Sequence, residues 1–187
     1  PVFFACGVPI GPASNQQEGA SSGHDQRDQS SLWQLGPAVS IRDFTLLEVG
    51  SLVQIRSITE NEFLATLGFS PIYPKVLPVT VLQASATSTT LAGPSERIAI
   101  LKYQGARSGF SLRIEEAAQD YHPARSTEDS EVSVGPAIVR YSFEDQDPSK
   151  ILLVASLFQN GTFIKLSMSC DPSLGRKGAF DLLIKLI

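Results

Sequence analysis

The chain has 187 residues, of which 42% are hydrophobic and 18% are charged, and its formal net charge is −4. A negative net charge with so few cations argues against a nucleic-acid-binding protein, which needs a basic surface to neutralise phosphates. The two cysteines are too few for a disulfide scaffold or a four-thiolate zinc site, and no apolar run approaches the roughly 18 residues of a membrane-spanning helix. The composition predicts one globular domain with a tail.

Residues 1–31 differ in composition from the rest of the chain. The first ten are mostly apolar, whereas residues 11–31 contain no aromatic residue and no aliphatic residue larger than alanine. Such a segment cannot bury enough apolar surface to offset the entropy of ordering it, so we expect it to be a flexible tether. The only methionine is Met168, and we therefore expect Pro1 to begin a processed product or a fragment.

The sequence Phe3-Phe4-Ala5-Cys6-Gly7 resembles the lipobox of bacterial lipoproteins, in which a small residue precedes a cysteine that becomes acylated. The resemblance implies that residues 1–5 are the remnant of a signal peptide and that Cys6 is the lipidation site. Residues 6–31 would then tether an extracytoplasmic domain to the membrane through acyl chains on that cysteine. The alternative is a secreted protein in which Cys6 pairs with Cys170. Without that disulfide, Cys170 is expected to be a small core residue at the end of a strand.

We expect the folded domain to span residues 32–187. Its first part is apolar, but the imperfect alternation of residues 52–58 leaves both strand and helix open. A capping box follows, in which Thr59 caps a helix of about eight residues and Glu62 bonds back to the cap. Gly68 supplies the end of this helix. The prolines that come next predict extended chain: Pro71, Pro74 and Pro78.

The pattern then changes to that of antiparallel strands. Residues 98–103 are mostly apolar, and residues 110–115 alternate strictly, which predicts two strands joined by a glycine-containing hairpin loop. The inward positions of the second strand are Phe110, Leu112 and Ile114. A polar surface loop is expected at residues 120–129. Residues 132–143 predict a further strand region, interrupted by a bend at Gly135-Pro136.

Asn160-Gly161 is the clearest turn signal in the chain. Both central residues of a type I′ turn need positive φ, which Asn-Gly supplies most easily. The turn pairs Gln159 with Thr162 and gives one face of the hairpin without any polar member. It also explains the match of Asn160-Gly161-Thr162 to a glycosylation sequon. The chain closes with a predicted helix that carries one apolar side: Phe180, Leu183, Ile184 and Ile187.

Together these elements predict an α+β domain with a single curved antiparallel sheet of five to seven strands, a short helix before it and a C-terminal helix packed on it. The order of elements over residues 59–187 resembles a bacterial extracytoplasmic domain of unknown function. That domain occurs in anti-sigma-factor-type and sporulation-associated membrane proteins, and it is akin to lipoprotein carriers and sigma regulators. The pieces that match are ENEFLATLGFSPIYPKVLP, IAILKYQ, FSLRIEE, VSVGPAIVRYSF and LFQNGTFIKLSM. The resemblance implies no catalytic residues.

The sequence also contains residue types that occur in known catalytic and metal sites, but their positions do not favour such a site. Ser21, Ser22, His24 and Asp25 have the letters of a hydrolytic triad, yet they lie in the predicted tether, where no geometry is held. Glu115 and Glu116 are adjacent and therefore on opposite strand faces. Asp145 and Asp147 could hold calcium, although a solvated turn explains them better. A metal site based on histidine is not expected, because the chain has two histidines in all, His24 and His122.

We therefore expect no enzyme, no cofactor and no metal. The sequence favours a lipid-anchored extracytoplasmic domain that recognises a protein or an amphiphile through a sheet face, without nucleic acid as a partner. One alternative is a periplasmic carrier of lipids or lipoproteins with an enclosed apolar cavity. The other is a hydrolase whose site assembles from scattered residues such as Ser108, Asp120 and His122.

Overall fold

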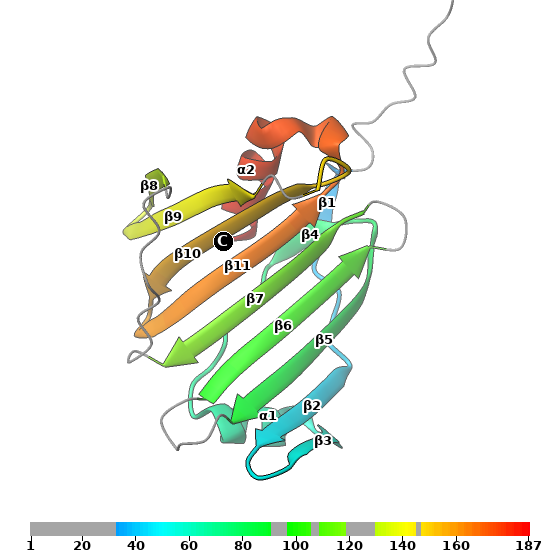
Figure 1. Cartoon of the computed structure of the whole chain (residues 1–187), viewed down its shortest axis with the longest axis vertical. Helices are drawn as coiled ribbons and strands as arrows, with labels where there is room; N and C mark the ends of the chain where they lie inside the picture. Colours follow the sequence, from blue (N-terminus) through cyan, green and yellow to red (C-terminus); the bar gives the residue numbers. More distant parts are fainter. Residues whose placement is uncertain (1–32, 91–96, 106–108, 119–129, 145–146) are drawn as a thin grey trace, which may run out of the picture.

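The computed structural model describes residues 33–90, 97–105, 109–118, 130–144 and 147–187. In this part of the chain, a nine-stranded sheet with the order β3-β2-β5-β6-β7-β11-β10-β9-β8 lies beside a two-stranded sheet of β1 and β4 (Figure 1). The strands are β1 (Leu35–Pro37), β2 (Asp43–Val49), β3 (Val53–Ile58), β4 (Val76–Pro78), β5 (Val81–Thr90), β6 (Arg97–Gly105), β7 (Ser111–Ala118), β8 (Ser130–Val134), β9 (Ala137–Glu144), β10 (Ile151–Gln159) and β11 (Thr162–Cys170). The helices are α1 (Glu60–Leu67) and α2 (Gly175–Leu186), the second preceded by a single 3-10 turn at Pro172–Leu174.

The sheet is larger than the sequence predicts, and it is mixed rather than antiparallel. β2 pairs with β5 in parallel, and the other neighbours in the large sheet are antiparallel. Three segments account for the difference in size. Residues 35–58, which the sequence left open, form three strands, of which β2 and β3 join the large sheet, so α1 lies between β3 and β4 and not before the sheet. Residues 81–90 form β5, a strand that the sequence did not predict. The expected bend at Gly135-Pro136 is a tight turn, with Gly135 at φ 57°, that separates β8 from β9.

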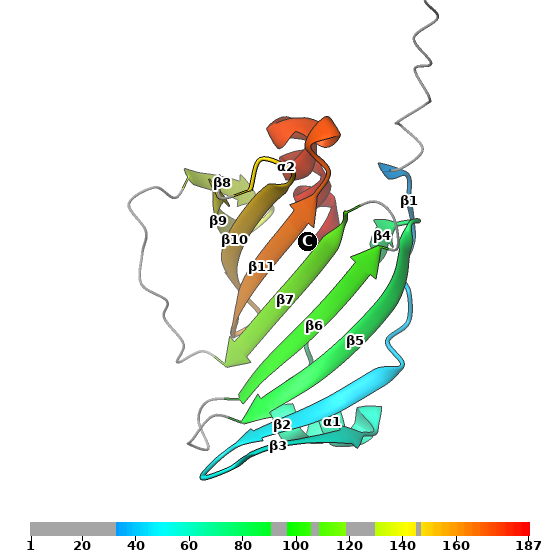
Figure 2. The same ribbon diagram turned by 45° about the vertical axis from the view of Figure 1, so that its right-hand side comes forward.

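Both helices cover one face of the large sheet, which we call the inner face, and the opposite face is the outer face. In Figures 1 and 2, α1 lies behind β2 and β5, and the body of α2 lies behind β10 and β11. The rings of Phe63 on α1 and Phe44 on β2 are 5.3 Å apart between centroids. At the other end, the ring of Phe180 on α2 packs on that of Tyr141 on β9 in a tilted arrangement, with 4.5 Å between centroids. The C-terminal helix is therefore packed on the sheet as expected, although it begins five residues earlier than residue 180.

The core lies between the inner face and the helices. Inward side chains of the central strands are buried almost completely, such as Leu101, Leu153 and Met168 at 1% exposure or less. Burying a side chain of this size contributes about 1.5–3 kcal/mol relative to leaving it in water. Phe110, Leu112 and Ile114 are buried as their alternation predicts. The hydrophobic effect thus fixes which side of each central strand faces the helices.

The two local signals of the sequence form as predicted. Thr59 Oγ1 accepts from the Glu62 amide at 3.2 Å, and the Glu62 carboxylate accepts from the Thr59 amide at 2.8 Å, which completes the capping box of α1. The helix has eight residues and ends at Gly68, whose φ is 72°. Asn160 and Gly161 have φ of 52° and 82°, and the β10–β11 register pairs Gln159 with Thr162. Both predictions are confirmed.

Candidate functional site

The outer face of the large sheet carries no helix among the described residues (Figure 2). Side chains alternate between the two faces of a strand, so the residues between the inward positions belong to this face. On most strands these outward positions are polar, as in the Ser85, Lys102 and Arg113 row that crosses β5, β6 and β7. One row differs from the rest.

This row is a line of directly opposed, mostly apolar residues that crosses seven neighbouring strands from β3 to β10. We call it the apolar stripe, and its members in spatial order are Ile55, Leu47, Thr89, Ile98, Ala117, Phe163 and Phe158. The stripe follows the end of the sheet where β5 and β7 finish and where the β10–β11 turn lies. Each step of the line is a ladder pair, so the members lie side by side across the sheet.

The two ends of the apolar stripe are open to solvent. Ile55 is 72% exposed on the edge strand β3, and Phe158 is 47% exposed beside the β10–β11 turn. In the middle, the short side chains of Thr89 and Ala117 are 5% and 7% exposed. The Thr89 hydroxyl is buried and has no hydrogen-bond partner among the described atoms. A buried hydroxyl without a partner is rare in folded proteins, so this position is incomplete as it stands.

Charged pairs border the stripe on the outer face. Arg113 donates to Glu115 at 2.6 Å on β7, and Arg140 donates to Glu131 at 2.7 Å across β8 and β9. Lys165 lies directly opposite Glu115 in the next ladder. These pairs are partly or largely exposed, so each adds about 0–1 kcal/mol to stability at most. They form a polar rim along one side of the apolar line.

Among the described residues, the inner face holds one buried carboxylate, that of Glu116 on β7, which is 1% exposed. It accepts from the amide of Ile72 at 2.7 Å and from Thr162 Oγ1 at 2.5 Å. Burial raises the pKa of Glu116, and the two hydrogen bonds oppose that rise. No second acid is hydrogen-bonded to it among the described residues, and its one side-chain partner there is the Thr162 hydroxyl. The carboxylate therefore fastens the proline-rich segment of Ile72 to the sheet, and it does not form an acid/base pair.

The structure does not bring the residues singled out from the sequence into one site. Thr59 and Glu62 cap α1, and Asn160 and Gly161 form the β10–β11 turn, at separate places in the fold. Cys6 lies outside the described residues. So do the residues of the two hydrolase arrangements: Ser21, Ser22, His24, Asp25, Ser108, Asp120 and His122.

Two further residues are explained by local structure. Cys170 is a free, fully buried thiol at the end of β11, as predicted, and burial raises its pKa to about 11. A thiol held in this protonated form is a poor nucleophile. Asp147 accepts from the amide and the hydroxyl of Ser149 at 2.9 and 2.6 Å, which is a turn motif, whereas Asp145 lies outside the described residues. The described part of the chain contains no group of three His, Cys, Asp or Glu residues that could hold a metal ion.

The sequence reasoning missed both Glu116 and the apolar stripe. Glu116 had a usable signal, because it occupies the next inward position after Phe110, Leu112 and Ile114, where a charge must find partners. The stripe had none, because it depends on which strands are neighbours. Ile55 and Phe158 are about a hundred residues apart in the chain and belong to strands whose pairing is decided by the whole sheet.

Comparisons with protein-family models, with curated proteins and with solved structures give no match for this chain. Among the described residues, no helix combines the length and the mean hydropathy that crossing a bilayer requires.

Proposed function

We propose that this chain is a non-catalytic binding domain that recognises a protein partner through the outer face of its large sheet. The observation that carries the proposal is the apolar stripe, which ends in exposed Ile55 and Phe158. A partner that covers these ends would bury their apolar surface. Recognition, and not bond chemistry, would then be the activity of the domain.

The surroundings of the stripe favour a protein over an amphiphile as the partner. Protein interfaces have an apolar centre and a polar rim, which is the arrangement of the stripe and of the Arg113–Glu115 and Arg140–Glu131 pairs. An amphiphile instead needs a concave site that encloses most of its surface. The stripe is a line of ladder pairs across seven strands that is exposed at its two ends, with no such enclosure formed by the described residues around it.

The proposal includes the location that the sequence predicts. The lipobox-like segment at Cys6 supports an extracytoplasmic domain held at a membrane by acyl chains, with residues 6–31 as its tether. A domain held in this way presents its sheet to partners within reach of the tether. Intact-mass and peptide mass spectrometry of the protein from its native membrane tests this part. A diacylated Cys6 at the amino terminus is expected. An unmodified Cys6 would refute the lipid anchor but not the proposed recognition surface on the sheet.

Site-specific photo-crosslinking tests the recognition surface. A photoreactive residue is placed at Ile55 or at Phe158 in the full chain, with a matched control at Val79, which is 51% exposed in the turn between β4 and β5. The same adduct is expected from both ends of the stripe and not from Val79. Adducts that form equally at all three positions, or at neither end of the stripe, would contradict the proposal.

A quantitative test follows once the adduct is identified. Phe158→Ser should weaken binding of the purified partner by about tenfold or more, because exposed aromatic residues are the common anchors of interfaces. Val79→Ser should leave the dissociation constant unchanged. Calorimetry of the two variants with the same partner preparation gives the comparison.

The alternative function, a lipid or lipoprotein carrier, has one specific observation in its favour. An apolar crevice of about 390 Å³ lies between the edge strand β8 and α2, and its apolar lining is Val132, Val134, Phe180 and Ile184. This volume is at the lower end of the range for ligand pockets. Organic extraction of the native protein distinguishes the two functions. Recovery of a stoichiometric amount of lipid from the wild type, but not from Val134→Glu, would favour the carrier.

A further inference from the structure

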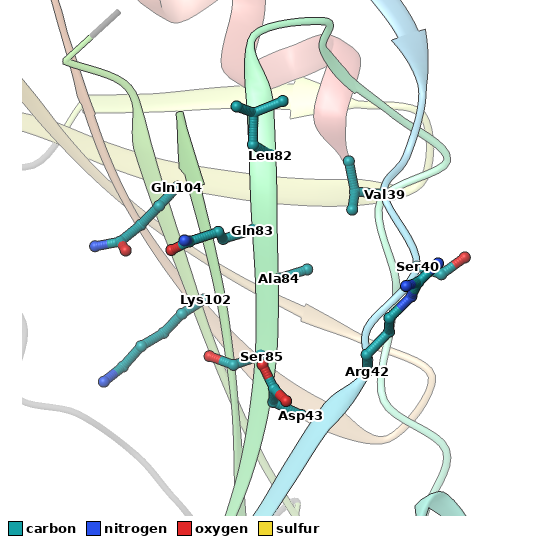
Figure 3. A pocket seen from close by; sticks show the side chains of 10 residues that line it. All are labelled: Val39, Ser40, Arg42, Asp43, Leu82, Gln83, Ala84, Ser85, Lys102 and Gln104. Atoms are coloured by element: carbon teal, nitrogen blue, oxygen red, sulfur yellow. The ribbon is translucent and has the colours of Figure 1, made fainter. Parts of the chain in front are cut away.

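A cleft opens where the large sheet is incomplete beside the first half of β5. β2 pairs with β5 from Asp43 and Ser85 onward, whereas the chain before Asp43 is held elsewhere. The Ala38 amide donates to the Lys75 carbonyl at 3.2 Å, because β1 belongs to the small sheet with β4. The linker of residues 38–42 therefore stands away from β5. A cavity of about 760 Å³ occupies the gap (Figure 3).

The lining of this cleft is mostly polar. Its polar members include Arg42, Asp43, Gln83, Ser85, Lys102 and Gln104. Gln83 and Gln104 are directly opposed across β5 and β6. Figure 3 shows their side chains on the same side of β5 as those of Ser85 and Lys102, whereas Val39 and Ala84 lie on the other side. The two carboxamides and the lysine thus face one space.

A second cavity of about 410 Å³ continues the cleft across the sheet. Both cavities are lined by Leu82, Gln83 and Gln104. The second cavity is also lined by Lys150 and by the serines Ser111 and Ser169. The carboxamide pair therefore lies between two lysines, one from each cavity. Lysine ammonium groups donate hydrogen bonds, whereas carboxamides both donate and accept. The combined groove has a lysine in each of its two cavities. The carboxamides that the cavities share can form hydrogen bonds with hydroxyl groups of a ligand.

The described lining of the groove holds more cations than carboxylates, and of these cations Lys150 lies near Asp147, whose pKa it helps to lower. Lys102 lies directly opposite Arg113 in the β6–β7 ladder, and like charges in that arrangement are destabilising. Arg113 is bound to Glu115 at 2.6 Å, whereas Lys102 forms no ion pair with a described carboxylate. Among the described residues that line either cavity, Asp43 is the one acidic residue, against Arg42, Lys102 and Lys150. This local excess of cations stands out in a chain whose net charge is −4.

From this groove we infer a binding site for a phosphorylated polyol. The phosphate is held by Lys102, with Lys150 at the far part of the groove, and the hydroxyl groups of the ligand are held by Gln83, Gln104 and the serines. A lysine that faces another cation in the free protein gains most when an anion occupies the site. The ligand can be a soluble polyol phosphate or the headgroup of a phospholipid, since both present this chemistry. The inference uses none of the residues of the apolar stripe.

A binding experiment with the full chain at low ionic strength tests the site. The probes are glycerol 3-phosphate, inorganic phosphate and glycerol. Their binding is measured by NMR through the amide chemical shifts of β5 and β6. Saturable shifts with glycerol 3-phosphate are expected, with weaker binding of inorganic phosphate and none of glycerol. Lys102→Gln should weaken the affinity about tenfold, because it removes a charge-assisted hydrogen bond. Binding should also weaken as salt is added.

The control variant is Lys177→Gln on α2, which removes the same charge from an exposed position on the other side of the sheet. It should bind as the wild type does, and unchanged circular dichroism checks that both variants are folded. Vesicles of phosphatidylglycerol and of phosphatidylcholine separate the two sources of the ligand. If phosphatidylglycerol vesicles are the only probe that binds, and Lys102→Gln abolishes this binding, the ligand of the site is a phospholipid headgroup. Absence of saturable binding to every phosphate probe, or equal binding by Lys102→Gln and the wild type, overturns the inference.

Discussion

The carboxylate of Glu116 on β7 and the hydroxyl of Thr162 on β11 form a 2.5 Å hydrogen bond in the interior of the domain. The same carboxylate accepts from the Ile72 amide, and Thr162 also lies 3.0 Å from the Gln159 carbonyl. One acidic residue thereby connects the proline-rich segment after α1 to the start of β11, beside the Asn160-Gly161 turn. These contacts link regions that are far apart in the chain, and they lead to the first prediction.

Glu116→Gln should fold and keep most of the stability of the wild type, whereas Glu116→Ala should lose about 1–3 kcal/mol. Glutamine can accept from Ile72 and donate to Thr162, whose own proton then turns to the Gln159 carbonyl. Alanine leaves the amide of Ile72 without its acceptor, which costs this much in other proteins, whereas the Thr162 hydroxyl keeps the Gln159 carbonyl as an acceptor. Urea unfolding of the two variants at one pH measures the difference. Equal stabilities for the two variants would contradict the role given to the carboxylate.

The same residue predicts a pH dependence. Because burial raises the pKa of Glu116 in the folded state, the folded protein binds a proton more tightly than the unfolded chain. Its contribution to stability is therefore present below the ordinary pKa of about 4.5 and is lost as the pH rises through the raised value. The unfolding free energy of the wild type should fall relative to that of Glu116→Gln over this window. A difference that stays constant with pH would refute the shift.

The capping box of α1 gives the third prediction. Thr59→Ala should destabilise the domain by about 1 kcal/mol, because the Glu62 amide loses its acceptor. The matched control is Thr66→Ala in the same helix, where the hydroxyl donates to the Glu62 carbonyl and caps nothing. Thermal unfolding of both variants separates the two positions. A larger loss for Thr66→Ala would show that the cap is not what stabilises this helix.

Glu62 should respond to acid in the opposite direction from Glu116. The hydrogen bond from the Thr59 amide, followed by that from its side chain, lowers the pKa of Glu62. Its support for the helix is therefore present above its ordinary pKa and lost as the pH falls through the lowered value. The effect is small because the carboxylate is exposed. An NMR titration of the Glu62 side chain in the wild type and in Thr59→Ala checks the shift, which should shrink in the variant.

The β10–β11 turn predicts a cost that arises from the backbone alone. A Cβ at Gly161 would meet no atom within 4 Å, but the φ of 82° is one that L residues avoid, so Gly161→Ala should lose about 1 kcal/mol. Gly50, in the β2–β3 turn, has the same open space without a positive φ. Gly50→Ala should therefore be neutral or slightly stabilising. Chemical denaturation of the two variants compares them, and an equal loss at both positions would mean that the strain at Gly161 is not the cause.

Two leucines test where the core ends. Leu153 is fully buried on β10, and Leu153→Ala should cost about 2–5 kcal/mol through lost burial and a cavity. Leu52 is 73% exposed at the β2–β3 turn, and Leu52→Ala should change stability by less than about 0.5 kcal/mol. Equilibrium unfolding gives both values. A large effect at Leu52 would mean that this turn is covered in solution, for example by a partner on the neighbouring Ile55.

The features that could be predicted from the sequence are those set by neighbours along the chain. The Thr59–Glu62 box needs four consecutive residues, and the Asn160-Gly161 turn fixes a register of adjacent strands, so both are decided by short-range sterics and hydrogen bonding. The inward burial of Phe110, Leu112 and Ile114 follows from a period of two residues in a half-buried strand. None of these features depends on the rest of the fold.

The features that the tertiary structure alone decided are those that join distant strands. β2 lies parallel to β5 although α1 and β4 separate them in the chain, and nothing local to either strand selects that neighbour. The apolar stripe from Ile55 to Phe158 exists only because seven strands lie in this order, and the cleft beside Gln83 exists because β2 joins β5 late. Strand pairing is chosen by the sum of packing and hydrogen bonding over the whole sheet, which no short window of sequence contains.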